Sequence, residues 1–137
     1  MNASPPTVLL IDDEGWTRTV TAASLTTSGR FRVVEAGSAA EGLDLAIRDR
    51  PDCILLDVVL PDAQGPDVLR RLRSSGVDRC PIVFVTTLSD DGQFQRLMDV
   101  GANAVLRKPV DLVRLPIVLE EILRVHASAG SVGPRPS

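Results

Sequence analysis

The sequence predicts an α/β fold built on a doubly wound parallel sheet of five strands. Five short apolar runs recur along the chain, and segments with helical periodicity separate them. This alternation requires crossover connections, which place helices on both faces of a parallel sheet. The runs are continuously apolar, as expected of strands that are covered on both faces.

The apolar runs indicate the strands, and the periodic segments indicate the helices. The expected strands are 7–11, 31–34, 53–56, 81–85 and 104–106. A first helix is expected at 15–28, although its many threonines make the apolar stripe irregular. The other four stripes are Leu43, Ala46 and Ile47; Val68, Leu69 and Leu72; Phe94, Leu97 and Met98; and Leu115, Val118, Leu119 and Ile122.

Glycines and prolines predict where these helices begin and end. Gly29, Gly76 and Gly101 fall where three helices should stop, and Pro66 falls where the third should start. Pro116 would remove a hydrogen bond from the interior of the last helix. We therefore expect a first turn at 111–115 and a regular helix from Pro116.

Length and charge limit the kind of protein that the chain can be. Its 137 residues fit one domain, expected at 7–126, with a disordered N-terminus at 1–6 and a flexible tail or linker at 127–137. A net charge of -3 argues against direct nucleic-acid binding. No apolar run approaches the roughly 20 residues needed to cross a bilayer, and MNASPP lacks the features of a leader. We expect a cytoplasmic protein without a membrane segment.

The cysteines and the single histidine do not form a recognisable metal motif. Cys53 and Cys80 are too far apart for a CxxC motif, and each lies beside an apolar run. We expect both to be small buried hydrophobes, with a redox pair as the alternative. His126 is the only histidine, which excludes sites that need several imidazoles, and it is expected at a helix C-terminus.

Polar residues stand directly at the ends of four of the predicted strands. Asp12 and Asp13 follow the first strand, Asp57 the third, Thr86 the fourth and Lys108 the fifth. Ligands of a doubly wound sheet bind outside the carboxyl ends of the strands, where the strand order reverses. These side chains are therefore expected to converge on one crevice.

Three carboxylates in one crevice favour a bound dication. They repel one another and resist full ionisation unless a cation joins them. Mg²⁺ prefers oxygen ligands and needs only one or two carboxylates and a carbonyl besides water. Lys108 supplies a second positive charge, and it is the only lysine beside fourteen arginines. Simple capping of helices or turns would explain Asp12 alone, but not the whole set.

The motifs LLIDDE, LLDVVLPDAQG, FVTT and RKP stand in a characteristic order and spacing over residues 7–126. In this the chain resembles the receiver domain of bacterial two-component response regulators. The resemblance implies a flavodoxin-like fold with strand order 2-1-3-4-5 and five helices. It also implies a signalling domain rather than an enzyme with external turnover.

The resemblance implies a role for each strand-end residue. Asp57 would be the nucleophile that accepts a phosphoryl group. Asp12, Asp13 and Asp57, with the backbone carbonyl of Val59, would hold Mg²⁺. Thr86 would donate a hydrogen bond to the phosphoryl group, and Lys108 would pair with it.

The sequence departs from the family pattern at one position, and it has apolar residues at two positions that influence how long the phosphoryl group persists in the family. The family usually has an aromatic residue where Val105 stands, so we expect loop and Thr86 movement in place of an aromatic switch. Val59 and Leu88 occupy positions that tune loss of the phosphoryl group in the family. Neither side chain can hydrogen-bond an attacking water, so slow self-hydrolysis is expected.

The implied partners are a sensor histidine kinase or phosphotransfer protein, and a downstream protein target or output domain. A phosphorylation-dependent dimer is also compatible with the sequence. The alternative function is that of a Mg²⁺-dependent phosphatase with an aspartate nucleophile. In such enzymes the nucleophile normally ends the first strand in a DxD arrangement, whereas this strand ends in DDE. Neither GxGxxG nor GxxxxGK[ST] is present to indicate a nucleotide site.

Overall fold

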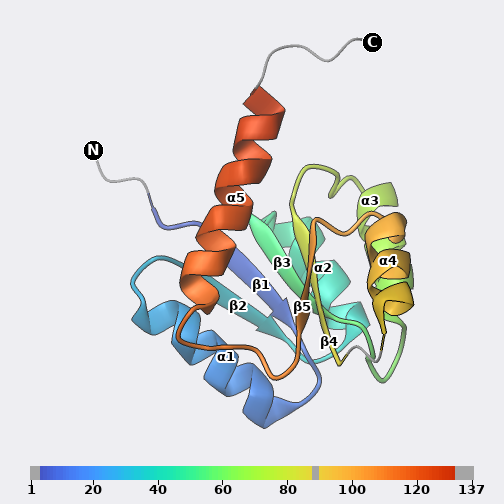
Figure 1. The fold of residues 1–137 in the computed structure, drawn as a ribbon, viewed down its shortest axis with the longest axis horizontal. Coiled ribbons are helices and arrows are strands. Elements are labelled where there is room, and N and C mark those ends of the chain that lie inside the picture. Colours follow the sequence, from blue (N-terminus) through green and yellow to red (C-terminus); the bar gives the residue numbers. More distant parts are fainter. Residues whose placement is uncertain (1–3, 88–89, 132–137) are drawn as a thin grey trace.

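The computed structural model describes residues 4–87 and 90–131 of the chain. Within this part, strands and helices alternate from the first element to the last, as Figure 1 shows. The strands are β1 (Thr7–Ile11), β2 (Arg32–Ala36), β3 (Cys53–Asp57), β4 (Ile82–Thr86) and β5 (Ala104–Arg107). The helices are α1 (Gly15–Thr27), α2 (Ala39–Asp49), α3 (Gly65–Ser74), α4 (Asp91–Val100) and α5 (Leu115–Ser131).

The five strands form one parallel sheet in the order β2-β1-β3-β4-β5, which confirms the predicted fold class and strand order. Every residue of β3 and β4 is buried, while the edge strands β2 and β5 are partly exposed. The chain turns to opposite sides of β1 to form β2 and β3. The carboxyl ends of β1 and β3 therefore flank the point where the strand order reverses.

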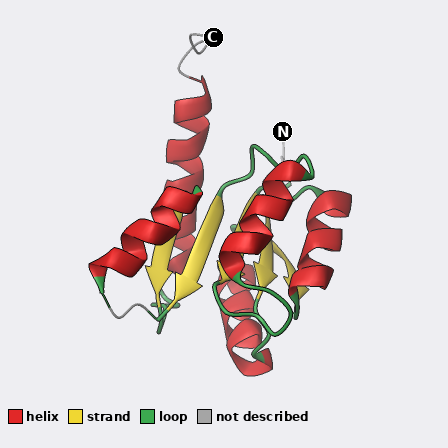
Figure 2. Cartoon of the chain, turned by 90° about the vertical axis from the view of Figure 1, so that its right-hand side faces the viewer, coloured by secondary structure: helices red, strands yellow, loops and turns green. Residues whose placement is uncertain are grey.

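Helices cover both faces of the sheet, as Figure 2 shows from the side. On one face α1 and α5 pack through Leu25, Leu115 and Leu119 against alternate residues of the strands. On the other face α2, α3 and α4 pack against the remaining strand residues, including Ile54 and Phe84. Each central strand contributes side chains to both cores, which explains why its sequence is continuously apolar.

The predicted glycine stops are confirmed by backbone conformation. Gly29, Gly76 and Gly101 follow or cap α1, α3 and α4 with φ values of +74°, +92° and +119°, a region that favours glycine. Helix α2 instead ends on Arg50, with φ of 49°. The sequence signal at that end is not a glycine but Pro51, which directly follows Arg50 and cannot continue the helix.

Helix α5 begins at Leu115, one residue before the predicted start, and places Pro116 in its first turn. It continues to Ser131 and so includes residues 127–131 of the expected tail. The expectation that His126 lies at a helix C-terminus is wrong, because the helix continues for five residues beyond it. The expectations for residues 1–3 and 132–137 fall outside the described residues. Among the helices described, none combines the length and apolar character needed to span a bilayer.

Candidate functional site

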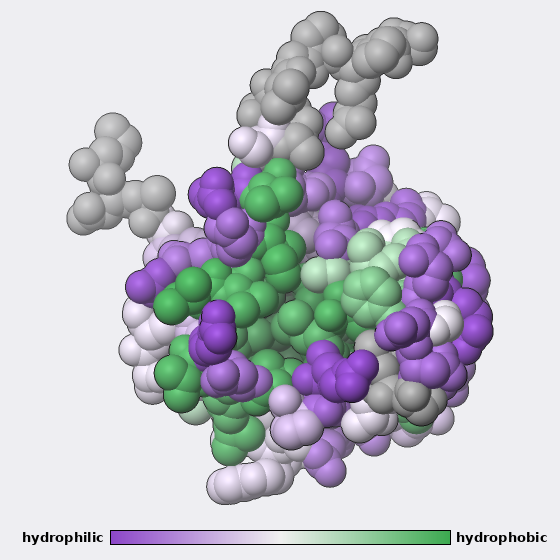
Figure 3. Space-filling view, in the orientation of Figure 1, coloured by the Kyte–Doolittle hydropathy of each residue, from purple (hydrophilic) through white to green (hydrophobic). Residues whose placement is uncertain are grey.

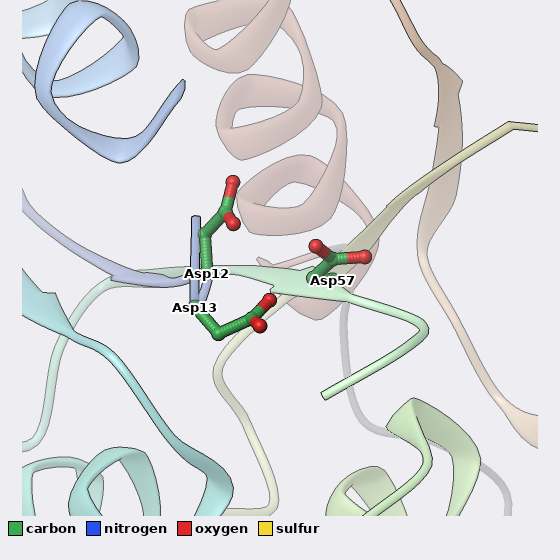
Figure 4. Close-up of side chains that lie close together, drawn as sticks. All are labelled: Asp12, Asp13 and Asp57. Atoms are coloured by element: carbon green, nitrogen blue, oxygen red, sulfur yellow. The ribbon is translucent and has the colours of Figure 1, made fainter. Parts of the chain in front are cut away.

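The five polar residues predicted at strand ends all lie at the carboxyl edge of the sheet. Asp57 is the last residue of β3, Thr86 is the last of β4, and the other three directly follow β1 or β5. Figure 4 shows the side chains of Asp12, Asp13 and Asp57 grouped where β1 and β3 end. The strand-end pattern therefore identified a spatial cluster that contains the three aspartates and Lys108.

The three aspartates form a compact group of oxygen ligands. One carboxylate oxygen from each lies within 4.8 Å of the others. Asp12 and Asp57 are buried, with exposed fractions of 5% and 8%, whereas Asp13 is exposed. The group is thus closed on the side of the sheet and open to solvent at Asp13.

Burial and the repulsion of neighbouring carboxylates work against ionisation of Asp12. Burial raises the pKa of Asp12, and the nearby charges of Asp57 and Asp13 raise it further. The backbone N–H of Glu14, which donates to Asp12 Oδ1 at 2.9 Å, and the charge of Lys108 lower this pKa and offset part of the rise. The remaining cost is what a bound cation would remove.

Lys108 forms an ion pair with Asp57, and its charge also acts on Asp12. Its Nζ donates a hydrogen bond to Asp57 Oδ2 at 2.9 Å, and both side chains are largely shielded from solvent. Burial lowers the pKa of Lys108, but the hydrogen bond and charge of Asp57 outweigh burial, so the pKa is raised. The backbone N–H of Lys108 also donates to the Thr86 carbonyl at 2.8 Å, which attaches the lysine to the end of β4. The Lys108–Pro109 peptide bond is cis.

The loop after β3 folds tightly against Asp57. The Val59 N–H lies 3.3 Å from Asp57 Oδ1, and Gly65 N–H donates to the Val58 carbonyl at 2.6 Å. A Cβ on Gly65 would lie 2.9 Å from both Phe84 Cε1 and Val58 Cα. Glycine is therefore needed here so that α3 can start directly beneath the backbone of Asp57.

Two residues that the sequence analysis did not identify connect the backbone around the site to neighbouring elements. Asp62, in the loop after β3, accepts the backbone N–H groups of Ala39 and Ala40 at 2.9 and 3.0 Å. Arg18 donates to the Asp12 carbonyl at 2.7 Å and pairs with Glu35 of β2 at 3.2 Å. A proline–aspartate turn indicates a loop, but nothing in the spacing indicates a partner more than twenty residues away.

The two cysteines, expected from the sequence to be small buried hydrophobes, are shielded from solvent to different degrees. Cys53 is fully buried and Cys80 half-buried. Burial raises the pKa of both thiols, that of Cys80 to about 12, which keeps them protonated and disfavours a reactive redox pair. Asp90 caps α4 by accepting the Gln93 N–H at 2.8 Å. Leu88 lies outside the described residues.

Comparison with known families decides between the classes of protein that share this fold. Residues 8–120 match the response regulator receiver domain. The chain belongs to this family. The match covers every element from β1 into α5 and includes all five strand-end residues.

Curated relatives of this receiver domain are response regulators. It is 39% identical over 119 residues to the transcriptional regulatory protein AfsQ1 of Streptomyces coelicolor, covering 87% of this chain and 52% of that protein. It is 35% identical over 117 residues to the response regulator MprA of Mycobacterium leprae, covering 85% of this chain and 50% of that protein. The chain thus spans about half the length of the curated relatives that it matches.

Solved structures support the fold. The receiver domain is similar to the chemotaxis protein CheY4 of Vibrio cholerae, with a TM-score of 0.79 and 28% identity, covering 86% of this chain and 98% of that one. It is also similar to a CheY-like receiver domain protein of Methanospirillum hungatei, with a TM-score of 0.81 and 25% identity, covering 93% of this chain and 100% of that one. The chain is therefore a receiver domain of the two-component response regulator family.

Proposed function

We propose that this receiver domain accepts a phosphoryl group on Asp57 from the phosphohistidine of a sensor kinase or phosphotransfer protein. The main support is the buried Asp57 carboxylate, which is held by Lys108 at 2.9 Å and clustered with two further carboxylates. Asp57 attacks phosphorus and forms a P–O bond while the P–N bond to the imidazole breaks. The imidazole leaves with the electron pair and takes a proton from solvent.

The donor set at this site fits Mg²⁺. The cluster offers only oxygen atoms, which Mg²⁺ prefers, and one side of it is open for the waters that the ion retains. Asp12, Asp13 and Asp57 would hold the ion together with the carbonyl of Val59, whose peptide N–H already lies beside Asp57. When bound, Mg²⁺ offsets the negative charge shared by the attacking carboxylate and the phosphoryl oxygens.

Lys108 and Thr86 would respond to the new group. A phosphoryl group adds nearly two negative charges, so the Lys108 ammonium gains a stronger partner than the Asp57 carboxylate alone. Thr86 would donate its hydroxyl to the same group from the end of β4. The backbone N–H of Lys108 is hydrogen-bonded to the carbonyl of Thr86. Movement of either side chain towards the phosphoryl group would therefore act on the ends of both β4 and β5.

The output surface would be the face formed by α4, β5 and α5. Figure 3 shows apolar side chains gathered on this face, which is hollowed near its middle. Each of the three elements contributes an apolar residue that is at least partly exposed. Phe94 of α4 and Val125 of α5 are 40% and 55% exposed, and Val105 of β5 is half-buried. A downstream target, an output domain or a second phosphorylated copy would bind there, in the cytoplasm.

Val59 supports a long-lived phosphoryl group. Its apolar side chain is 62% exposed beside Asp57 and offers no hydrogen bond to an attacking water. The domain would therefore act as a switch that is set by its donor and resets slowly, and not as an enzyme that turns over external substrates.

Covalent labelling tests the assignment of the phosphoacceptor. Incubation with acetyl phosphate and Mg²⁺ is expected to add one phosphoryl group to the wild type, detected by intact-mass spectrometry, and none to Asp57→Asn. Asp90→Asn is the matched control, because it makes the same change at a helix cap at the end of another loop. Undiminished labelling of Asp57→Asn, mapped to Asp12 or Asp13, would show that the wrong carboxylate has been assigned.

A further inference from the structure

A cavity of about 340 Å³ opens directly beside the acid cluster, between α1 and the segment that follows β5. Its walls include Trp16 and Val20 of α1, and Val110 and Leu112 on the opposite side. Asp57 and Lys108 also line it. One space therefore joins an apolar chamber to the carboxylate that would be phosphorylated.

The lining of this cavity determines the chemistry of its occupant. Apart from the charged groups at the sheet edge and three threonines, the residues that line it are apolar, so it has few groups to bind the hydroxyls of a sugar or the edges of a base. Trp16 is 76% exposed at the rim, and exposure of so large an aromatic side chain to water is unfavourable in free energy. The cavity is thus suited to an apolar group that carries its charge at one end.

We propose that this cavity binds the apolar acyl group of a small-molecule acyl phosphate, and so selects aromatic or branched acyl phosphates as direct phosphodonors to Asp57. The inference rests on the proposed function of Asp57 and names a substrate class for it. It also explains why an apolar chamber, and not a solvated one, adjoins the acid cluster.

The transfer step balances without any further reactant. An oxygen of the Asp57 carboxylate forms a bond to phosphorus while the bond between phosphorus and the acyl oxygen breaks. The departing carboxylate keeps the electron pair, and no net proton is exchanged. Donor and product are both mixed anhydrides of phosphoric acid, so the free-energy change of the transfer is close to zero. Transfer from a phosphate ester to Asp57 would instead be unfavourable in free energy.

The size of the expected preference follows from the area that an aromatic ring would bury. A phenyl group exposes far more apolar surface than the methyl group of acetyl phosphate, and burying the difference favours binding by roughly tenfold or more. We therefore expect benzoyl phosphate to label Asp57 roughly tenfold faster than acetyl phosphate at equal, low concentration.

The experiment compares the two donors within each protein sample, so that losses of folded protein cancel. In Val20→Phe a ring fills the cavity from α1, and the ratio of benzoyl to acetyl labelling rates is expected to fall several-fold. Thr17→Phe is a second filling variant at another lining residue. Thr19→Phe is the matched control, since Thr19 lies on the same helix but is exposed and does not line the cavity.

The outcomes separate this inference from the proposed function. A wild-type ratio that is retained in Thr19→Phe and reduced in both filling variants supports the cavity as the acyl site. A ratio that is the same in all four proteins, with acetyl phosphate still labelling Asp57, overturns the inference and leaves the proposed function standing. Failure of both donors to label wild-type Asp57 overturns both.

Discussion

The two edges of the sheet use charge in opposite ways. At the carboxyl edge, the carboxylates of Asp12, Asp13 and Asp57 cluster around a single ammonium group, that of Lys108. Burial raises the pKa of Asp12, the charges of Asp57 and Asp13 raise it further, and the Glu14 N–H and the Lys108 charge offset only part of the rise. Binding of a cation at this edge would therefore be favourable.

At the amino edge, basic side chains are satisfied by backbone carbonyls of the loop between α3 and β4. Arg73 donates to the carbonyls of Val77 and Cys80 at 3.1 and 2.7 Å, and Arg50 donates to that of Gly76 at 3.0 Å. His126 of α5 contacts the Arg79 carbonyl of the same loop. Burial lowers the pKa of Arg73, although nearby Cys80 and Asp78 oppose this.

The difference separates the edge that carries the candidate site from an edge with a structural role. Hydrogen bonds to a charged donor stabilise a fold when each acceptor is already in place, as in the loop between α3 and β4. The carboxylates of Asp12 and Asp57 also accept hydrogen bonds, but they lie beside a third carboxylate, and such a cluster is suited to bind a cation. Substitutions at the carboxyl edge are therefore expected to affect labelling and Mg²⁺ binding, and substitutions at the amino edge to affect the free energy of unfolding.

The largest effect is expected at Lys108. Lys108→Ala removes the only cation hydrogen-bonded to Asp57 among the described residues and is expected to slow labelling roughly a hundredfold. Lys108→Arg keeps the charge but not the compact head group. It is expected to retain labelling and to weaken the response to a beryllofluoride phosphoryl mimic, measured by Trp16 fluorescence and by amide exchange over residues 87–107. Equality of Lys108→Arg with the wild type in both measurements would show that charge alone suffices.

A smaller effect is expected from the loop that carries Val59. Asp62 and Ser38 both cap the N-terminus of α2, but only Asp62 belongs to the loop after β3. Asp62→Ala is expected to weaken Mg²⁺ binding roughly tenfold, because the loop loses its attachment to α2. Ser38→Ala removes a cap and leaves the loop attached, so Mg²⁺ affinity, measured by titration calorimetry, should not change. Equal losses in the two variants would mean that only the stability of α2 matters.

Arg73 tests the structural edge. Arg73→Met keeps most of the apolar stem but removes the hydrogen bonds to Val77 and Cys80, and is expected to lower the free energy of unfolding by about 2 kcal/mol. Urea denaturation gives this value, while labelling of the folded variant by acetyl phosphate should match the wild type. A labelling defect without loss of stability would contradict the division between the two edges.

The smallest effect concerns pH. Hydrogen bonds from Ala39 and Ala40 lower the pKa of Asp62 below its ordinary value of 3.8, so folding favours the ionised carboxylate. The stabilisation is complete above pH 3.8 and is lost as the pH falls through the lower value of the folded state. The difference in unfolding temperature between wild type and Asp62→Ala should be constant near neutral pH and shrink in acid. A difference that grows in acid would reverse the assigned sign.

Local patterns in the sequence determined the elements and the strand-end residues of the site. Continuous apolar runs predict buried strands because both faces of a parallel sheet are covered, and glycine predicts helix ends because it alone adopts positive φ without cost. Parallel strands bring their carboxyl ends to one edge, so the convergence of Asp12, Asp57 and Lys108 follows from topology. The resemblance of the motifs supplied the strand order.

Only the tertiary structure decided which loops hold the site and where α5 ends. The attachment of Asp62 to α2 and of His126 to the loop before β4 joins residues that are more than twenty positions apart in sequence, through one or two hydrogen bonds that leave no periodic signal. The continuation of α5 through 127–131 also contradicts the composition of that stretch, whose small and polar residues indicated a tail. Periodicity records which residues are buried, whereas such attachments depend on distances in space that arise only when the chain has folded.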